Sequence, residues 1–335
     1  MKHILIVNIN WLGDAIFSTP VFKAIKESYP DARLACLCPP RVKDVMALCP
    51  YVDKIIIYDE QHKHRWPWQK IKLIMRLRQE HFDAAVLLHR SLTRALLVYL
   101  AGIKNRVGFS KAKGLLTRVV ALPLKDTHRA DGYLQAVTGL GINPHPGVCQ
   151  LRLNDNDIDA VEALLRARDL HEGKFIVFHP GGNWDLKRWP VASWVNLARR
   201  INERWQMPVL ITGTEADKRL CQQIQQQAGV GCIVLAGQTR LGESLVIFKK
   251  AKALISGDSG PLHLANSVGG CVIGLFGPTK ASITGPRGVG TQAIISHDTG
   301  CNKTPCYYLN CPANVCMTSI TVDDVIKEIE RVIAG

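Results

Sequence analysis

The chain has 335 residues, of which 47% are hydrophobic and 21% are charged, and its formal net charge at pH 7 is +14. This composition excludes an intrinsically disordered chain and is typical of a globular protein long enough for two domains with sizeable cores. The longest uninterrupted apolar runs, such as residues 95–101, are far shorter than the roughly 18 residues that a membrane-spanning helix needs.

The opening of the chain alternates short apolar runs with stretches of helical periodicity. This βαβ rhythm predicts a parallel sheet with helices on both faces. The first apolar run continues into Asn8, Asn10 and Asp14 rather than into a small-residue cleavage site, so we expect a first strand, not a signal peptide, and a cytoplasmic protein. The predicted strands are residues 3–8, 33–38 and 54–58, and the predicted helices are residues 15–28 and 42–48.

The same rhythm starts again near residue 174, after a stretch rich in glycine and proline at residues 139–147. Two such units predict twin Rossmann-like domains, residues 1–150 and 151–320, whose parallel sheets face a central cleft. A final segment, residues 321–333, has apolar side chains at helical spacing and predicts an amphipathic helix. In the second unit the predicted strands are residues 174–179, 208–212, 232–235, 253–255 and 272–276, and the predicted helices are 193–204, 217–228, 241–250 and 261–268.

Most of the positive charge lies in the first half of the chain. Residues 1–150 hold 22 Lys and Arg against 11 Asp and Glu, a net +11, whereas residues 151–335 hold 20 against 17, a net +3. Residues 63–78 contain no acidic residue and mix Lys and Arg with Trp66, Trp68 and aliphatic side chains. Such a mixture suits a surface that lies against anionic lipid, and equally a solvated helix face that covers a core. No zinc-finger, helix-turn-helix or aromatic strand motif accompanies the charge, so we expect no nucleic-acid binding.

The most informative segment is residues 255–266, Ile-Ser-Gly-Asp-Ser-Gly-Pro-Leu-His-Leu-Ala-Asn, where a predicted strand turns into a helix. Free backbone N–H groups and the positive end of a helix dipole attract an anion at such a junction, and phosphate is the natural ligand. Asp258, Ser259 and Gly260 lie at the turn, and His263 lies one helical turn further on. The alternative is that Asp258 and Ser259 only cap the helix.

Two further segments of this kind follow predicted strands. They are residues 8–14, Asn-Ile-Asn-Trp-Leu-Gly-Asp, and residues 179–190, His-Pro-Gly-Gly-Asn-Trp-Asp-Leu-Lys-Arg-Trp-Pro. Open parallel sheets bind ligands beyond the carboxyl ends of their strands, so all three segments are expected at the cleft. With Gly213-Thr214-Glu215 and Phe276-Gly277-Pro278-Thr279, and in this order, they resemble the ADP-heptose:lipopolysaccharide heptosyltransferases, glycosyltransferase family 9, over nearly the whole chain.

The resemblance implies the GT-B architecture, with an acceptor-binding first domain, a nucleotide-sugar-binding second domain, and a terminal helix (321–333) that crosses back to pack on the first domain. It also implies that the residues matching Lys187, Glu215, Asp258 and His263 form the ADP-sugar site, and that Asp14 is the general base.

Each of these residues also has a chemical argument of its own. Lys187 can neutralise a diphosphate and follow the negative charge that grows on a departing nucleotide. Residues 258–260 present backbone N–H groups to a phosphate, and Glu215 can accept hydrogen bonds from ribose hydroxyls. His263 fits either a contact with the ligand or a buried structural role.

Asp14 opens the helix after the first strand, where a carboxylate is often a plain cap. A sugar hydroxyl that attacks an anomeric carbon needs a positioned proton acceptor, and this is the role implied for Asp14. Gly13 beside it, together with Lys63 and Arg65 of the basic stretch, is expected to contact the acceptor. Trp11 is expected to pack rather than to take part in the chemistry.

Four of the eleven cysteines, Cys301, Cys306, Cys311 and Cys316, are separated from one another by four residues. Structural zinc sites usually bring their ligands in two close pairs, which this spacing does not do. A reducing compartment also disfavours disulfides. Free thiols, a metal or redox-sensitive cluster and a disulfide remain open in that order, and similar cysteine-rich segments occur in the resembled family.

These features predict an inverting, metal-independent transfer of heptose from ADP-heptose to the Kdo and heptose residues of the lipopolysaccharide inner core, resembling heptosyltransferase II and acting at the inner face of the inner membrane. No cofactor is expected, and Lys187 with the helix amino terminus is expected to supply the positive potential. The alternatives are a non-catalytic nucleotide- or glycolipid-binding protein on the same fold, and a transferase that uses another nucleotide sugar. A dehydrogenase is disfavoured because Gly-x-Gly-x-x-Gly does not follow the first strand.

Overall fold

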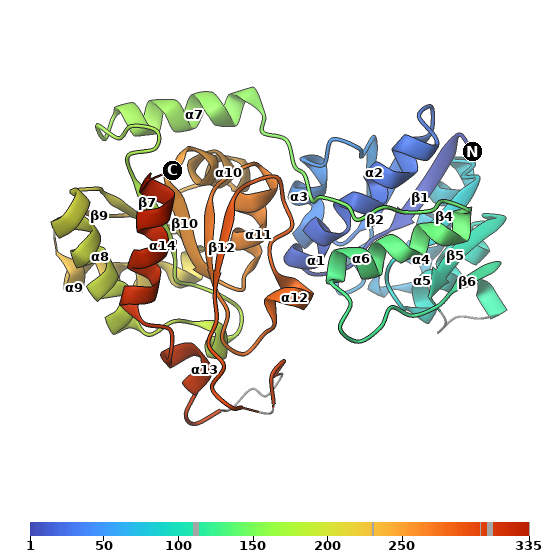
Figure 1. Cartoon of the computed structure of the whole chain (residues 1–335). Helices are drawn as coiled ribbons and strands as arrows, with labels where there is room; N and C mark the ends of the chain where they lie inside the picture. Colours follow the sequence, from blue (N-terminus) through green and yellow to red (C-terminus); the bar gives the residue numbers. More distant parts are fainter. Residues whose placement is uncertain (110–113, 230, 302, 307–310, 335) are drawn as a thin grey trace. The chain divides into compact units, whose positions relative to one another are not determined.

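The computed structural model describes residues 1–109, 114–229, 231–301, 303–306 and 311–334. The chain divides into two compact units, Met1–Arg152 (unit 1) and Leu153–Gly335 (unit 2). Each unit is built on one parallel sheet of six strands with helices packed against it (Figure 1). The prediction of two Rossmann-like α/β domains is therefore confirmed. Among the described residues, no helix is both long and apolar enough to cross a bilayer.

The sheet of unit 1 has the strand order β3-β2-β1-β4-β5-β6. Its central strands are apolar along their whole length because helices cover both faces of a parallel sheet. All four residues of β4 are buried, as are the last four of β1. The strands are β1 His3–Val7, β2 Arg33–Cys38, β3 Lys54–Ile57, β4 Ala84–Leu87, β5 Asn105–Phe109 and β6 Arg118–Val120.

Helices α4 and α5 cover one face of this sheet, where Leu73 and Leu77 of α4 and Leu97 and Val98 of α5 share a core with alternate residues of the strands. Helices α1, α2, α3 and α6 form a second contiguous group. The helices of unit 1 are α1 Leu12–Phe17, α2 Thr19–Ser28, α3 Lys43–Ala47, α4 Pro67–Gln79, α5 Leu92–Leu100 and α6 Arg129–Leu134.

The helix predicted over residues 15–28 is two helices, because the chain breaks at Ser18. Pro20 has no backbone N–H to donate to the carbonyl of Ile16, and the hydroxyl of Thr19 donates to that carbonyl instead, at 2.8 Å. The Ser18 hydroxyl donates to the carbonyl of Ala15 at 2.7 Å. The break leaves α1 as a short helix that follows β1 directly.

The sheet of unit 2 has the strand order β12-β11-β10-β7-β8-β9. Numbered within the unit, this is the order of unit 1, and it is the doubly wound Rossmann order. The strands are β7 Ile176–His179, β8 Val209–Ile211, β9 Cys232–Val234, β10 Ala253–Gly257, β11 Val272–Leu275 and β12 Gln292–Ile295. The helices are α7 Asp155–Arg166, α8 Val191–Trp205, α9 Lys218–Ala228, α10 Leu241–Lys250, α11 Gly260–Ser267, α12 Ala281–Thr284, α13 Val315–Thr318 and α14 Val322–Ala334.

The expectation that the terminal helix packs on the first domain is wrong. Val325, Ile326 and Ile329 of α14 are buried in the core of unit 2, and α14 contacts α8, β11 and β12 (Figure 1). The amphipathic pattern was correctly identified, but a pattern of apolar residues does not specify which surface covers it. Here the apolar stripe of α14 completes the core of its own unit.

The strand order places the informative sequence segments. The order reverses between β1 and β4 in unit 1 and between β7 and β10 in unit 2, and ligands of doubly wound sheets bind beyond the carboxyl ends of the strands at such a switch point. Residues 8–14 follow β1, residues 180–190 follow β7, and Asp258 follows β10. Each of the three segments therefore lies at a switch point of its unit.

Candidate functional site

The segments after β7 and β10 bring three predicted residues of unit 2 into one buried cluster. The ammonium of Lys187 donates to Asp258 Oδ2 at 2.7 Å, and His263 Nε2 lies 3.3 Å from Asp258 Oδ1. The side chains of Asp258 and His263 are each 5% exposed, whereas that of Lys187 is 24% exposed. Lys187 thus links a buried carboxylate to the solvent-facing edge of the sheet.

The carboxylate of Asp258 is ionised despite its burial. Burial alone would raise its pKa, but hydrogen bonding and charge from His263, together with the Lys187 ammonium, hold the pKa of Asp258 well below its usual range. Thr284, the last residue of α12, donates to Asp258 Oδ2 at 3.2 Å. The carboxylate therefore orients a lysine and a histidine from two different elements.

Close packing fixes the position of Lys187. A Cβ atom at Gly257, the last residue of β10, would lie 2.6 Å from the backbone oxygen of Lys187, so only glycine allows this approach. The turn that carries the lysine, Asp185–Lys187, is a single 3-10 turn. Lys187 Nζ also lies 5.5 Å from the centroid of the Trp184 ring. The ammonium is thus positioned from both sides.

Helix α11 starts at Gly260, with Ser259 as its N-cap residue and Pro261 in its first turn. The hydroxyl of Ser259 makes no capping hydrogen bond and pairs instead with the hydroxyl of Ser256 at 2.8 Å. Asp258 is engaged by Lys187, His263 and Thr284. The alternative that these two side chains merely cap the helix is therefore not what the geometry shows.

Glu215 does not join the Lys187 cluster by any direct contact. It begins a 3-10 turn after β8, one strand away from β7 on the same sheet edge, and its exposed carboxylate pairs with Lys218 at 3.1 Å. Gly237, at φ +72°, passes so close to Glu215 that an added Cβ would overlap its Oε2. Glu215 is thus held at the rim, free to turn towards a ligand.

In unit 1, the carboxylate of Asp14 has a partner that no sequence pattern predicted. Trp11, not Asp14, is the N-cap residue of α1, and Asp14 is the third residue of the helix. Asp14 Oδ1 accepts a hydrogen bond of 2.9 Å from the hydroxyl of Tyr133 in α6. Burial and the charge of Asp14 raise the pKa of Tyr133, so the phenol stays protonated and donates. Asp14 is a held carboxylate with its second oxygen available.

A buried arginine fixes the chain that leads to Asp14. Arg94, which is 2% exposed, donates to the carbonyl of Asn8 and to Asn10 Oδ1, both at 2.6 Å, and to Glu60 Oε2 at 3.0 Å. His89, after β4, lies in the same region; burial and the charge of Arg94 lower its pKa, so the ring is neutral at pH 7. The carboxyl ends of β1 and β4 and the segment after β3 are tied together here.

The remaining predicted residues of unit 1 lie on the surface. Trp11 is 59% exposed and carries Arg41 over its ring at 5.0 Å, so the expectation that it packs in the interior is wrong. Gly13 is half-buried beside Asp14. Lys63 and Arg65 lie in an exposed 3-10 turn after β3, and no contact joins them to Asp14. The structure brings Gly13 to Asp14 but leaves both basic residues apart.

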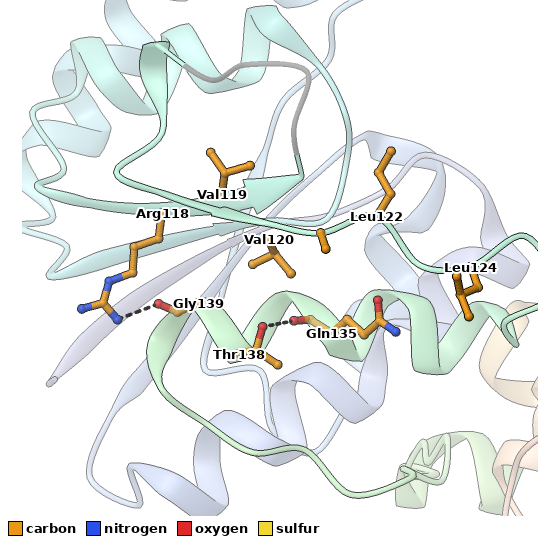
Figure 2. A pocket seen from close by; sticks show the side chains of 9 residues that line it. Arg118, Val119, Val120, Leu122, Leu124, Gln135, Thr138 and Gly139 are labelled. Carbon is orange, nitrogen blue, oxygen red and sulfur yellow. Dashed lines mark hydrogen bonds between the residues drawn. The ribbon is translucent and has the colours of Figure 1, made fainter.

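A shallow hollow of about 690 Å³ lies at the edge strand β6 of unit 1 (Figure 2). Arg118 donates to the carbonyl of Gly139 and the Thr138 hydroxyl donates to the carbonyl of Gln135, which closes one side of it. Its other lining residues are largely apolar, and Leu124 is 82% exposed. None of the predicted site residues lines this hollow.

All four cysteines of the C-terminal segment are free thiols. Cys301 and Cys311 are exposed, and Cys306 and Cys316 are half-buried. Burial and the neighbouring cysteines raise the pKa of Cys316, while backbone N–H groups of residues 313 and 314 lower that of Cys311. In the part of the chain that the structure describes, no group of three His, Cys, Asp or Glu side chains is arranged to bind a metal ion.

The sequence does contain Asp-x-Asp spacings, at residues 155–157 and 157–159, a pattern that can bind a metal-nucleotide complex. These residues begin α7, where Asn154 caps the helix by accepting from the backbone N–H of Asp157 at 2.8 Å. The Asp157 carboxylate pairs with Arg240 at 3.3 Å. This acidic run serves the start of a helix and lies outside the Lys187 cluster.

Comparison with known proteins identifies relatives of the whole chain. The model of glycosyltransferase family 9 (heptosyltransferase) matches residues 70–313. Lipopolysaccharide heptosyltransferase 2 of Salmonella typhimurium is 28% identical over 302 residues, covering 84% of this chain and 85% of the relative. The solved structure of Escherichia coli ADP-heptose LPS heptosyltransferase II is 23% identical with a TM-score of 0.79, over 100% of this chain and 99% of that one.

A second solved structure, E. coli heptosyltransferase WaaC with ADP, is 16% identical with a TM-score of 0.76 and covers 99% of this chain and 100% of that chain. Likenesses at this identity show the fold, which is the GT-B fold expected from the sequence.

Proposed function

Because the chain belongs to glycosyltransferase family 9, we propose that this glycosyltransferase moves a heptose from ADP-heptose to the inner core of lipopolysaccharide, with inversion and without a metal ion. The relatives named above support the substrate class, since their names specify heptose transfer to lipopolysaccharide and one solved relative holds ADP. The acceptor is anchored in a membrane, so the proposal places the enzyme at the inner face of the inner membrane.

The observation that carries the proposal is the Lys187–Asp258–His263 cluster at the switch point of unit 2. It places an ammonium, held by an ionised and buried carboxylate, beside the amino terminus of α11. A diphosphate bound there meets one full positive charge and uncapped backbone N–H groups in a partly desolvated site. Glu215, at the rim after β8, is assigned to the ribose hydroxyls of the nucleotide.

In the proposed reaction, Asp14 accepts the proton of the attacking acceptor hydroxyl. The hydroxyl oxygen forms a bond to the anomeric carbon on the face opposite the nucleotide, and the bond from that carbon to the β-phosphate oxygen breaks with its electron pair, so that ADP leaves. Lys187 stabilises the charge that develops on the leaving phosphate. Tyr133 holds one oxygen of Asp14, which leaves the other to receive the proton.

Two other functions differ from this one by testable features. A non-catalytic nucleotide- or glycolipid-binding protein would have no use for a proton acceptor held as Asp14 is held. A transferase for another nucleotide sugar would keep the phosphate site and differ in the groups that contact the base and the sugar. The choice of nucleotide therefore separates the second alternative from the proposal.

The test combines calorimetric titration of ADP, UDP, GDP and CMP with mass analysis of the products formed on truncated lipopolysaccharide acceptors. We expect ADP to bind most tightly and one heptose to be added to an inner-core acceptor. Addition of chelator should leave the rate unchanged. Preference for another nucleotide, or the absence of transfer by a protein that binds ADP, contradicts the proposal.

Lys187→Ala sharpens the same test. Because the ammonium is assigned to the diphosphate and to the leaving group, the variant should bind ADP at least about tenfold more weakly and transfer heptose more slowly still. Adenosine affinity should change little. Arg188→Ala is the matched control, since Arg188 pairs with the surface residue Asp185 at 2.8 Å. Equal ADP affinity in Lys187→Ala and wild type removes Lys187 from the phosphate site.

A further inference from the structure

Two neighbouring helices of unit 1 present large apolar side chains to solvent. On α4, Trp68, Ile71 and Met75 are 52%, 56% and 58% exposed and repeat at the spacing of one helical stripe. Trp66, just before α4, is 53% exposed and stacks on Trp68 with ring centroids 5.0 Å apart. On α5, a second exposed stripe consists of Leu92, Leu96, Tyr99 and Leu100.

The two stripes belong to one surface, here called the α4–α5 face. Helices α4 and α5 pack against each other, and Arg78 near the end of α4 donates to the carbonyl of Leu100 at 2.9 Å. Their opposite stripes are buried together on the sheet, as Leu77 and Val98 show. Each helix is therefore apolar on its outer side as well as its inner side, which a helix on the surface of a globular protein has no reason to be.

Positive charge surrounds the α4–α5 face. Lys63, Arg65, Lys72 and Arg76 are exposed, and none of them forms an ion pair within the described part of the chain. The nearby carboxylates are neutralised by other partners, since Glu80 pairs with Lys54 at 2.5 Å and Glu60 with Arg94 at 3.0 Å. The exposed side of α5 carries no charged residue. The face is apolar in the middle and basic at its edge.

We propose that the α4–α5 face is a membrane-docking surface, which lies in the interface of an anionic bilayer with its tryptophan and aliphatic side chains among the acyl chains. Indole rings favour the boundary between headgroups and hydrocarbon, and each basic side chain near anionic lipid contributes about 1 kcal/mol. A second copy of the chain fits the face poorly, because a symmetric contact would set two basic rims against each other.

The proposal rests on the proposed function in one respect only, that the acceptor is a membrane lipid. Docking through α4 and α5 would then confine the enzyme to the surface that holds its acceptor, with no spanning segment required.

The test measures binding of the full chain to vesicles of phosphatidylethanolamine and phosphatidylglycerol by cosedimentation, with phosphatidylcholine vesicles for comparison and without any sugar substrate. Wild type should bind the anionic vesicles and release at high salt, because exposed charges are screened. Lys72→Gln with Arg76→Gln should weaken binding by up to about 30-fold, which is 1 kcal/mol for each charge. Ile71→Ser with Met75→Ser and Leu96→Ser should weaken it at least about tenfold at unchanged charge.

Matched controls change exposed residues of unit 2. Val289→Ser removes an apolar side chain that is 55% exposed, and Arg168→Gln with Arg219→Gln removes two exposed positive charges. Both should bind vesicles as wild type does. Lipids brominated in their acyl chains should quench the fluorescence of wild type, and Trp66→Phe with Trp68→Phe should remove most of that quenching.

Three results would overturn the proposal: no binding of wild type to anionic vesicles, equal binding by the α4–α5 variants and the controls, or a wild-type dimer that becomes monomeric in the Ile71, Met75 and Leu96 variant. The last result would assign the face to a second copy. ADP titration of the same variants keeps the two proposals separate. Unchanged ADP affinity with lost vesicle binding supports the docking surface, whereas vesicle binding by a protein that binds no nucleotide leaves it standing while the function fails.

Discussion

The two units share one strand order but place different chemistry at the same point of it. At the switch point of unit 2, Lys187, Asp258 and His263 satisfy one another in a largely buried cluster beside the amino terminus of α11. At the switch point of unit 1, Asp14 is half-buried, has a neutral phenol as its hydrogen-bond partner, and lies beside the exposed Trp11.

This difference is chemical, since the scaffold is the same. A carboxylate locked between an ammonium and an imidazole is a poor proton acceptor but a good anchor for positive charge. A carboxylate held by a phenol keeps an oxygen available for a proton. The comparison therefore assigns affinity and local stability to the site of unit 2, and proton transfer to the site of unit 1.

The largest expected effect is on turnover, in Asp14→Asn. Loss of a general base should lower the transfer rate by roughly 100-fold or more, while ADP affinity stays close to that of wild type. Steady-state rates and calorimetric ADP titration measure the two quantities. Asp44→Asn, an exposed acidic residue in the first turn of α3, is the control. A near wild-type rate for Asp14→Asn would make the two switch points equivalent and remove the contrast.

A second effect concerns stability in acid. The pKa of Asp258 is depressed in the folded protein, so its contribution to stability is complete well above the unfolded value of about 3.8 and is lost as the pH falls towards the folded value. Asp258→Asn should cost about 2 kcal/mol at pH 6. Its unfolding free energy should also fall less steeply than that of wild type between pH 5 and pH 3.

Urea unfolding at several pH values measures this difference. Asp185→Asn serves as the control, because Asp185 is 84% exposed and its loss should leave the slope unchanged. Equal slopes for Asp258→Asn and wild type would show that the cluster of unit 2 does not hold its carboxylate as described.

The smallest expected effect is that of Tyr133→Phe. Removal of the hydroxyl deletes one hydrogen bond to a charged group, worth about 1.5 kcal/mol, so turnover should fall by about tenfold through poorer positioning of Asp14. KM for the donor and ADP affinity should not change. The variant should have no further effect in an Asp14→Asn background, and an additive loss in the double variant would place the action of Tyr133 elsewhere.

Local patterns predicted the elements of both sheets well where apolar runs and turn residues agree. The predicted helix at residues 241–250 matches α10 residue for residue, and the strand at 33–38 matches β2. The break at Ser18 was missed because the helical periodicity continues across it, although Pro20 carried the signal. The partner of α14 was wrong because its apolar stripe has no address.

The chain sequence by itself determined which residues bear the chemistry: Lys187, Asp258 and His263 at strand ends, and Asp14 after β1. Parallel strands bring their carboxyl ends to one edge, so the spacing of strands and polar turns is enough to gather these groups. Only the tertiary structure decided that Tyr133, 119 residues from Asp14, donates to it, that Thr284 completes the site of Asp258, and that α4 and α5 join their exposed apolar stripes. Such contacts depend on how helices pack across a sheet, and packing leaves no periodic trace in the sequence.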